Sequence, residues 1–250
     1  MYFKTLKKIV GLIGFKLIEK NFIKNERIIN SRSIFNTKYL LKKIFLNFKI
    51  EYLIQIGAND GLRFDELNQF IKNKKPKSIL VEPIKVYCDE LKKNYSSYKN
   101  VFIENSAIST DSNKTDGYLY KVSNKFLNNY DDHVLGINSF DKNHLSKHGV
   151  KSSHIIKEEV NIISIKFLLN KYNIKKLDLL FVDAEGYDGN IIIDFLDNSN
   201  LKPIIIFEYI HINNKIIKEL ITKLDNKNFL YFKLNENLVC FPEEKVDLIL

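Results

Sequence analysis

Short apolar runs alternate along the chain with longer segments in which apolar residues recur every three or four positions. Apolar runs of strand length lie at 52–56, 78–81, 100–109, 177–183 and 203–207. Nearly continuous apolar strands separated by helices are typical of a parallel sheet that is covered on both faces. Two further runs, at 229–234 and 238–241, flank a polar turn and predict an antiparallel hairpin. The pattern therefore predicts an α/β fold, with a mostly parallel sheet and a C-terminal hairpin.

Helical spacing predicts helices over 36–48, 62–73, 86–95, 166–172 and 214–224, with Asn36 capping the first. Residues 110–158 are the least regular part, with a short strand predicted at 117–120, and a longer strand is predicted after them at 160–165. A long polar insertion in a compact domain often forms a lid or a substrate loop. We therefore divide the chain into an arm, 1–49, and a catalytic domain, 50–250, in which 110–158 is an irregular substrate or lid insertion.

The positive charge is concentrated in the arm. Residues 1–50 contain twelve Lys or Arg residues and two Glu residues, and so carry more than the whole net charge of +9. Within 1–30, apolar residues at helical spacing alternate with lysines. We weigh three interpretations: a helix packed on the domain, which we favour, a helix docked peripherally on an anionic membrane surface, and a nucleic-acid-binding segment. The last is disfavoured because Arg is scarce and no nucleic-acid motif is present.

The length of 250 residues suits one α/β domain with a full core. Cys88 and Cys240 are too few and too far apart for a disulfide framework or a zinc site, which indicates a reducing compartment. No apolar run is long enough for a transmembrane helix. We therefore expect a cytoplasmic protein. If the arm docks on a membrane, we expect peripheral contact at the inner membrane face. The sequence does not indicate an oligomeric state.

Glycines and polar residues follow directly after the first apolar run. Gly57 and Gly61 flank Asn59, and a strand, a glycine-rich turn and a helix together place backbone N–H groups against a nucleotide-like ligand. Glu82 follows the second run, where a carboxylate can accept hydrogen bonds from both hydroxyls of a ribose. This spacing fits a dinucleotide or S-adenosylmethionine (SAM). Leu62 stands where a dinucleotide site has its third glycine, which disfavours a nicotinamide-dependent oxidoreductase.

Further polar residues end the later strands. Asp183 and Glu185 follow the run 177–183, and Glu208 and His211 follow the run 203–207. Because ligands bind outside the carboxyl ends of parallel strands, Asp183 is the best candidate for a functional carboxylate. Glu185 also suits the N-terminus of the next helix, where a carboxylate is favoured by the helix dipole.

We do not expect a functional role for Asp178 or for the histidines of 110–158. Asp178 lies at the opposite end of its strand, where we expect an exposed role. Four of the five histidines fall within 110–158, and we interpret them as scattered surface side chains rather than as a metal cluster.

Four motifs in order resemble the FkbM-type family of class I SAM-dependent methyltransferases, over residues 50–242. They are the Gly-Ala-Asn-Asp-Gly turn at 57–61, Val-Glu-Pro at 81–83, Asn-Ser-Ala-Ile-Ser at 105–109, and the strand 177–183 followed by Ala-Glu-Gly-Tyr-Asp at 184–188. The resemblance implies a Rossmann-like sheet and O-methylation of a hydroxyl on a sugar, glycan, glycolipid or similar small molecule. Gln55 departs from the pattern, because many methyltransferases carry there an acid that orients the SAM amine.

The resemblance also assigns roles. The residues implied in cofactor binding are Gly57, Asn59, Asp60, Gly61, Glu82, Asn105 and Ser106. A hydroxyl acceptor must lose a proton, and two versions stay open. His211 or Asp183 acts as the general base without metal, or Asp183 and Glu208 hold a divalent cation that polarises the hydroxyl. The alternatives are the oxidoreductase and a non-catalytic module that keeps a SAM pocket and docks on a membrane through the arm.

Overall fold

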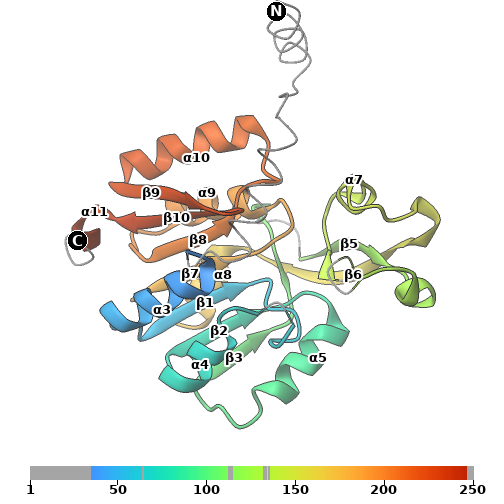
Figure 1. The fold of residues 1–250 in the computed structure, drawn as a ribbon, viewed down its shortest axis with the longest axis horizontal. Helices are drawn as coiled ribbons and strands as arrows, with labels where there is room; N and C mark the ends of the chain where they lie inside the picture. The colour runs from blue at the N-terminus through green and yellow to red at the C-terminus, as the bar shows by residue number, and fades with distance from the viewer. Residues whose placement is uncertain (1–34, 64, 112–114, 132–133, 135, 247–250) are drawn as a thin grey trace, which may run out of the picture.

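A seven-stranded sheet in the order β3-β2-β1-β7-β8-β10-β9 forms the centre of the computed structural model (Figure 1). The structure describes residues 35–63, 65–111, 115–131, 134 and 136–246. The strands of this sheet are β1 (Tyr52–Ile56), β2 (Lys77–Val81), β3 (Val101–Glu104), β7 (Leu179–Val182), β8 (Ile204–Glu208), β9 (Phe229–Leu234) and β10 (Asn237–Pro242). The proposed amphipathic segment 1–30 lies outside the described residues. Within them, no helix is long and apolar enough to cross a membrane.

The sheet confirms the predicted mixture of parallel and antiparallel strands. β1, β2, β3, β7 and β8 pair in parallel, whereas β10 is antiparallel to both β8 and β9. The chain runs outward from β1 through β2 to β3, and then returns to place β7 on the other side of β1. The strand order thus reverses at β1, and the crevice outside the carboxyl ends of β1 and β7 is where such sheets bind their ligands.

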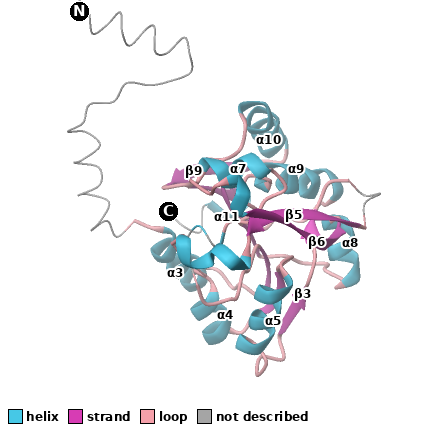
Figure 2. Ribbon diagram, turned by 90° about the vertical axis from the view of Figure 1, so that its right-hand side faces the viewer, coloured by secondary structure: helices cyan, strands magenta, loops and turns pink. Residues whose placement is uncertain are grey.

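Helices cover both faces of the sheet and form two apolar cores (Figures 1 and 2). One core joins the sheet to α8 (Ile165–Lys171), α9 (Asp188–Asn198) and α10 (Asn214–Asn226), with Phe195 and Phe207 fully buried. The other joins the opposite face to α3 (Thr37–Asn47), α4 (Asn68–Lys74) and α5 (Lys85–Asn94), with Leu41 and Ile71 fully buried. Because both faces are buried, the strands carry continuous apolar residues, as the sequence pattern predicted.

The start of one helix agrees with the prediction, and the start of another lies later in the chain than predicted. Asn36 caps α3 as expected, since its Oδ1 accepts a hydrogen bond from the backbone N–H of Tyr39 at 2.9 Å. The helix predicted over 62–73 begins only at Asn68. Asp65 accounts for the delay, because its carboxylate accepts the backbone N–H of Leu67 and holds the preceding segment in a turn.

The run 100–109, predicted as one strand, is divided in two. β3 ends at Glu104 and a second, two-residue strand, β4 (Ala107–Ile108), joins a different sheet. Asn105 causes the break, because its side-chain amide donates to the backbone carbonyls of Glu82 and Pro83, both at 2.9 Å. A residue tied to the neighbouring strand in this way no longer continues the β3 ladder.

The segment that we expected to be irregular contains a second sheet. β5 (Asp116–Val122) pairs antiparallel with β6 (Ile155–Ile163), and β4 pairs in parallel with β6. Between β5 and β6 lie two short 3-10 helices, Asn124–Asn129 and Ser152–His154, and the helix α7 (Lys142–Lys147). Val122, Ile137, Leu145 and Val150 form a small core of their own. In Figure 1 this insertion projects sideways from the carboxyl ends of the central strands.

Candidate active site

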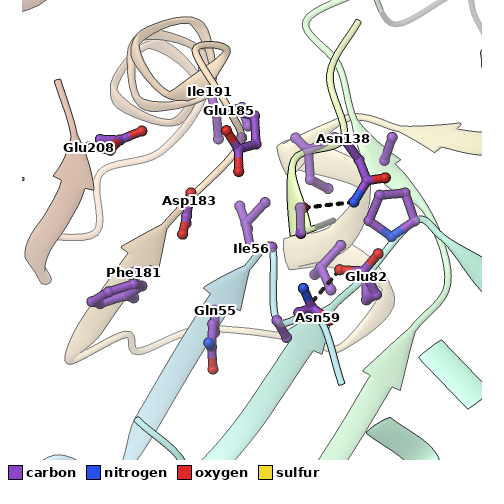
Figure 3. Close-up of a pocket in the computed structure, with 18 of the residues that line it drawn as sticks. Gln55, Ile56, Asn59, Glu82, Asn138, Phe181, Asp183, Glu185, Ile191 and Glu208 are labelled. Carbon is purple, nitrogen blue, oxygen red and sulfur yellow. Dashed lines mark hydrogen bonds between the residues drawn. The ribbon is translucent and has the colours of Figure 1, made fainter. Parts of the chain in front are cut away.

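A cavity of about 250 Å³ lies over the carboxyl ends of the central strands, between the main sheet and the insertion (Figure 3). β1, β2, β7 and β8 contribute the residues Gln55, Ile56, Val81, Phe181 and Glu208. The turns after these strands contribute Gly57, Asn59, Glu82, Asp183, Glu185 and His211, and the insertion contributes Gly136, Asn138, Phe140 and His148. The predicted site residues Gly57, Asn59, Glu82, Ser106, Asp183, Glu208 and His211 all line this cavity.

The turn after β1 requires glycine at its first position. Gly57 has φ +82°, and a Cβ added there would lie 1.8 Å from the carbonyl oxygen of Asp183. Its N–H donates to the carbonyl of Val81 at 2.9 Å, so the turn is held against the end of the neighbouring strand. Gly57 thus lets the ends of β1, β2 and β7 converge closely at the floor of the cavity.

Glu82 organises the other side of the cavity. Its Oε2 accepts the backbone N–H of Asn59 at 2.9 Å, and its Oε1 accepts the backbone N–H of Ile84 at 2.8 Å. The residue is only 4% exposed, and this burial raises the pKa of its carboxyl to about 7, against the two N–H donors. Each oxygen keeps a further lone pair for a ligand hydroxyl.

Three of the residues expected to contact a cofactor do not line the cavity. Gly61 packs against α5, where an added Cβ would lie 2.5 Å from Leu91 and 2.7 Å from Tyr95. Asp60 accepts the backbone N–H groups of Leu62 and Arg63, both at 2.8 Å, and so stabilises the turn. Asn105 bridges β2 and β3, as described above. The turn 57–61 therefore serves partly to hold the structure together: its first three residues, Gly57, Ala58 and Asn59, line the cavity, whereas Asp60 and Gly61 do not.

Gln55 and Asp65 form a pair that the sequence did not reveal. The Gln55 side-chain amide donates to Asp65 Oδ1 at 3.1 Å. Gln55 Oε1 and Asp65 Oδ2 are both buried and have no hydrogen-bond partner among the described residues. Both residues line the cavity. Two acceptors without donors suit a cationic donor such as a ligand ammonium, so Asp65 supplies the acid that is absent at position 55.

An acidic wall faces Glu82 across the cavity. Figure 3 shows Asp183, Glu185 and Glu208 together on one side and Glu82 with Asn59 on the other. Burial and the neighbouring charges of Asp183 and Glu185 raise the pKa of Glu208 to about 8. Burial and the charge of Asp183 likewise raise the pKa of Glu185 to about 8. Carboxylates that repel one another in a buried wall favour a positively charged ligand.

Asp188 and Asp178 have structural roles, and Glu185 does not have the structural role that we considered for it. Asp188, rather than Glu185, occupies the start of α9, where it accepts the backbone N–H groups of Ala184 and Gly186, both at 3.1 Å. Glu185 instead adopts the left-handed backbone, with φ +51°, and points into the cavity. Asp178 is buried rather than exposed, because its Oδ2 accepts the backbone N–H groups that begin β1.

Three histidines gather beside the acidic wall, contrary to the expectation of scattered surface side chains. One ring nitrogen from each of His144, His148 and His211 lies within 4.8 Å of the others. His144 and His148 are four residues apart, a spacing that places both on one side of a helical turn and that the sequence interpretation overlooked. His154 is separate, since its ring stacks on Phe126 within the insertion.

One carboxylate is hydrogen-bonded to a ring of this cluster, and a second carboxylate lies near another ring. His144 Nε2 lies 3.0 Å from Glu185 Oε2, and His211 Nε2 lies 3.8 Å from Glu208 Oε2. Burial lowers the pKa values of His144 and His211, and for His211 the other two imidazoles add to this effect. Both shifts favour the neutral form of the ring.

The sheet order, the antiparallel strand β10 next to its far edge and the cavity at the switch point define a class I SAM-dependent methyltransferase fold. The profile of the FkbM methyltransferase domain matches residues 55–231, and the chain belongs to this family. Membership of this methyltransferase family argues against the oxidoreductase alternative. No curated protein matches the chain.

Solved structures with a similar course of the chain include several methyltransferases. An FkbM methyltransferase from Methylobacillus flagellatus is 10% identical, with a TM-score of 0.46, and the match covers 77% of this chain and 43% of that one. Fibrillarin from Methanococcus jannaschii is 13% identical, with a TM-score of 0.40 and coverage of 78% and 66%. An O-methyltransferase from Bacillus cereus in complex with SAH is 8% identical, with a TM-score of 0.42 and coverage of 94% and 96%. The chain thus spans less than two thirds of the first two proteins.

Proposed function

We propose that this protein transfers a methyl group from SAM to a hydroxyl of a sugar, glycan, glycolipid or similar small molecule. The observation that carries the proposal is the division of one cavity into two walls. Glu82 offers acceptor oxygens suited to a ribose, and Asp183, Glu185 and Glu208 form an acidic wall suited to a cation and to proton removal.

The residues present fit the cofactor. Glu82 would hold the two ribose hydroxyls through the lone pairs that its backbone donors leave available. Gln55 Oε1 and Asp65 Oδ2 would accept the ammonium of the methionine part, which would satisfy two buried oxygens that otherwise have no donor. Ser106 and Ile108 line the cavity beyond Glu82, where an adenine ring would lie.

The chemistry requires alignment and removal of one proton. When bound, SAM supplies a methyl group on a positively charged sulfur, which is a good leaving group and ends as a neutral thioether. The acidic wall would bind the positively charged sulfonium of SAM more favourably than the neutral thioether of the product. Glu208 would take up the proton of the acceptor hydroxyl, and its raised pKa suits it to this transfer near neutral pH.

The insertion is suited to select the acceptor. Gly136, Asn138, Phe140 and His148 line the cavity opposite the central sheet. Ser139 ties the insertion to the loop after β7, because its hydroxyl donates to the carbonyl of Glu185 at 3.0 Å. A cavity wall with one aromatic ring and several polar groups suits a hydroxylated small molecule.

Release of SAH in the presence of a panel of sugars, glycolipids and polyketide-type alcohols tests the proposal. We expect turnover with at least one hydroxylated acceptor, and a product whose added methyl group is on oxygen by NMR. Methylation confined to nitrogen, carbon or sulfur acceptors would contradict the O-methylation. Tight SAM binding without turnover on the whole panel would favour the non-catalytic binding module.

A further inference from the structure

The histidine cluster His144, His148 and His211 has no role in the function proposed so far. The ring centroids lie 4.6 to 5.1 Å apart, and the rings are tilted or perpendicular rather than stacked. The cluster joins two separate parts of the chain, since two members belong to α7 and its C-terminal cap and the third follows β8.

We propose that His144, His148 and His211 form a binding site for a first-row divalent transition metal, with Zn²⁺ the ion that fits best. Three imidazoles are one of the ligand sets found in catalytic zinc sites, in which the fourth position stays open. The described residues contain one group of at least three His, Cys, Asp or Glu side chains close enough to share an ion, and it is this cluster. Imidazole nitrogen favours Zn²⁺, Cu²⁺ or Ni²⁺ over Mg²⁺ or Ca²⁺, which prefer oxygen ligands.

The distances require only a small adjustment. Tetrahedral Zn²⁺ bonds to nitrogen at about 2.0–2.1 Å, which places ligand nitrogens roughly 3.3 Å apart. The ring nitrogens lie within 4.8 Å of one another, so the distances between them must shorten by up to about 1.5 Å. His148 and His211 are half-buried, so a shift of their rings toward the buried His144 would not require movement of fully buried side chains.

Carboxylates stand where zinc sites place their supporting groups. Glu185 Oε2 lies 3.0 Å from His144 Nε2, and a carboxylate bonded to a ligating imidazole commonly fixes its orientation. Glu208 Oε2 lies 3.8 Å from His211 Nε2. The positive ion would also offset the repulsion within the acidic wall.

An ion bound at this site would have two effects, one on the insertion and one on the cavity. Because α7 belongs to the insertion and His211 to the main sheet, the bound ion would fasten the insertion over the cavity. His148 and His211 line the cavity, so the ion would lie at its wall on the side of Glu185 and Glu208. A direct bond from the ion to the acceptor hydroxyl is a consequence that rests on the proposed function, whereas metal binding itself does not.

Metal binding can be measured without cofactor or acceptor. The full-length protein is stripped with a chelator and then titrated calorimetrically with Zn²⁺, and separately with Co²⁺ while the visible absorption of tetrahedral Co²⁺ is recorded. We expect one ion per chain, with Mg²⁺ binding far more weakly. His148→Ala and His211→Ala should each weaken Zn²⁺ binding by at least about 100-fold, because loss of a direct ligand exceeds the 10- to 100-fold effect of a supporting group.

Lys147→Gln is the matched control, because Lys147 is exposed, lies on α7 between the two histidines and leaves all three imidazoles in place. It should bind Zn²⁺ as the wild type does, and circular dichroism should show that all variants are folded. Absence of stoichiometric Zn²⁺ binding, or equal affinity in the histidine variants, would overturn the metal site. Either result would refute the metal site without refuting SAM binding or methyl transfer by the wild-type protein. Failure of this inference is therefore distinguishable from failure of the proposed function.

Discussion

Replacement of Glu82 tests the ribose subsite in the most detail. Both carboxylate oxygens already accept a backbone N–H, from Asn59 and Ile84, and each has one lone pair left for a ribose hydroxyl. A hydrogen bond to a charged group contributes about 1.5–3 kcal/mol, so two such bonds contribute at least about 3 kcal/mol. Since 1.4 kcal/mol corresponds to a factor of ten, Glu82→Ala should weaken SAM binding by about 100-fold or more.

The assay compares ligands as well as variants. Calorimetry at pH about 8.5, where a carboxyl group with a pKa of about 7 is ionised, gives the dissociation constants of SAH and of SAH without its two ribose hydroxyls. The wild type should prefer intact SAH by about 100-fold, and Glu82→Ala should bind both ligands nearly equally. This comparison separates loss of the ribose contact from general damage to the turn, which would weaken both ligands alike.

Asp89→Asn is the control, because Asp89 is an exposed carboxylate on α5 that pairs with Lys85 outside the cavity. It should retain the full preference for intact SAH. The reasoning is refuted if Glu82→Ala keeps the wild-type preference between the two ligands, since the hydroxyls would then bind elsewhere.

Four further changes test other parts of the site. Asp183→Asn should abolish turnover in the SAH-release assay while the unfolding midpoint stays within a few degrees, and retained activity would remove Asp183 from the mechanism. Gly57→Ala should destabilise the protein by more than about 3 kcal/mol in urea, because its Cβ would overlap the carbonyl of Asp183; a smaller loss would show that the turn can yield. Asp65→Asn should weaken SAM binding about 10-fold but barely change binding of an analogue without the ammonium, and equal losses would argue against that contact. Glu208→Gln should stabilise the ligand-free protein above pH 8 and have no effect near pH 4, because a folded-state pKa raised from 4.5 to about 8 makes wild-type stability fall as pH rises through this window. The shift corresponds to about 5 kcal/mol at full strength, and solvent screening of this partly exposed carboxyl reduces the expected gain to about 2 kcal/mol. A pH-independent difference in chemical denaturation would contradict the assignment.

The arrangement of the sheet and the acids at its strand ends followed from local patterns. Continuous apolar runs identified the buried parallel strands, and polar residues directly after them identified Glu82, Asp183 and Glu208. These features are legible because the edge of a parallel sheet gathers residues by topology alone. The structure accordingly confirms that β7 and β8 are neighbours, and that Asp183 and Glu208 line one cavity.

Features that depend on tertiary contacts were not predicted. Gly61 fits the glycine motif, but its φ of +72° and its packing against Leu91 and Tyr95 serve the attachment of α5. The Gln55–Asp65 pair joins a strand to a turn ten residues later, a contact with no periodic signal. The strands predicted at 117–120 and 160–165 overlap β5 and β6, but their pairing into a second sheet was not predicted, because it joins segments about forty residues apart.

The histidine cluster combines a feature that is visible in the sequence with one that depends on the tertiary structure. The spacing of His144 and His148 was visible in the sequence, whereas their approach to His211 depends on how the insertion folds back onto the main sheet. Asp178 shows the same dependence, because only the pairing of β7 with β1 brings the backbone N–H groups of Glu51 and Tyr52 to its carboxylate.

The most direct test of the central claim is calorimetric titration of the purified protein with SAM, SAH and NAD in parallel. The account predicts micromolar binding of SAM and SAH at one site per chain, and no binding of NAD. Binding of NAD alone, or of none of the three, would contradict the assignment of Glu82 and the acidic wall to a SAM site.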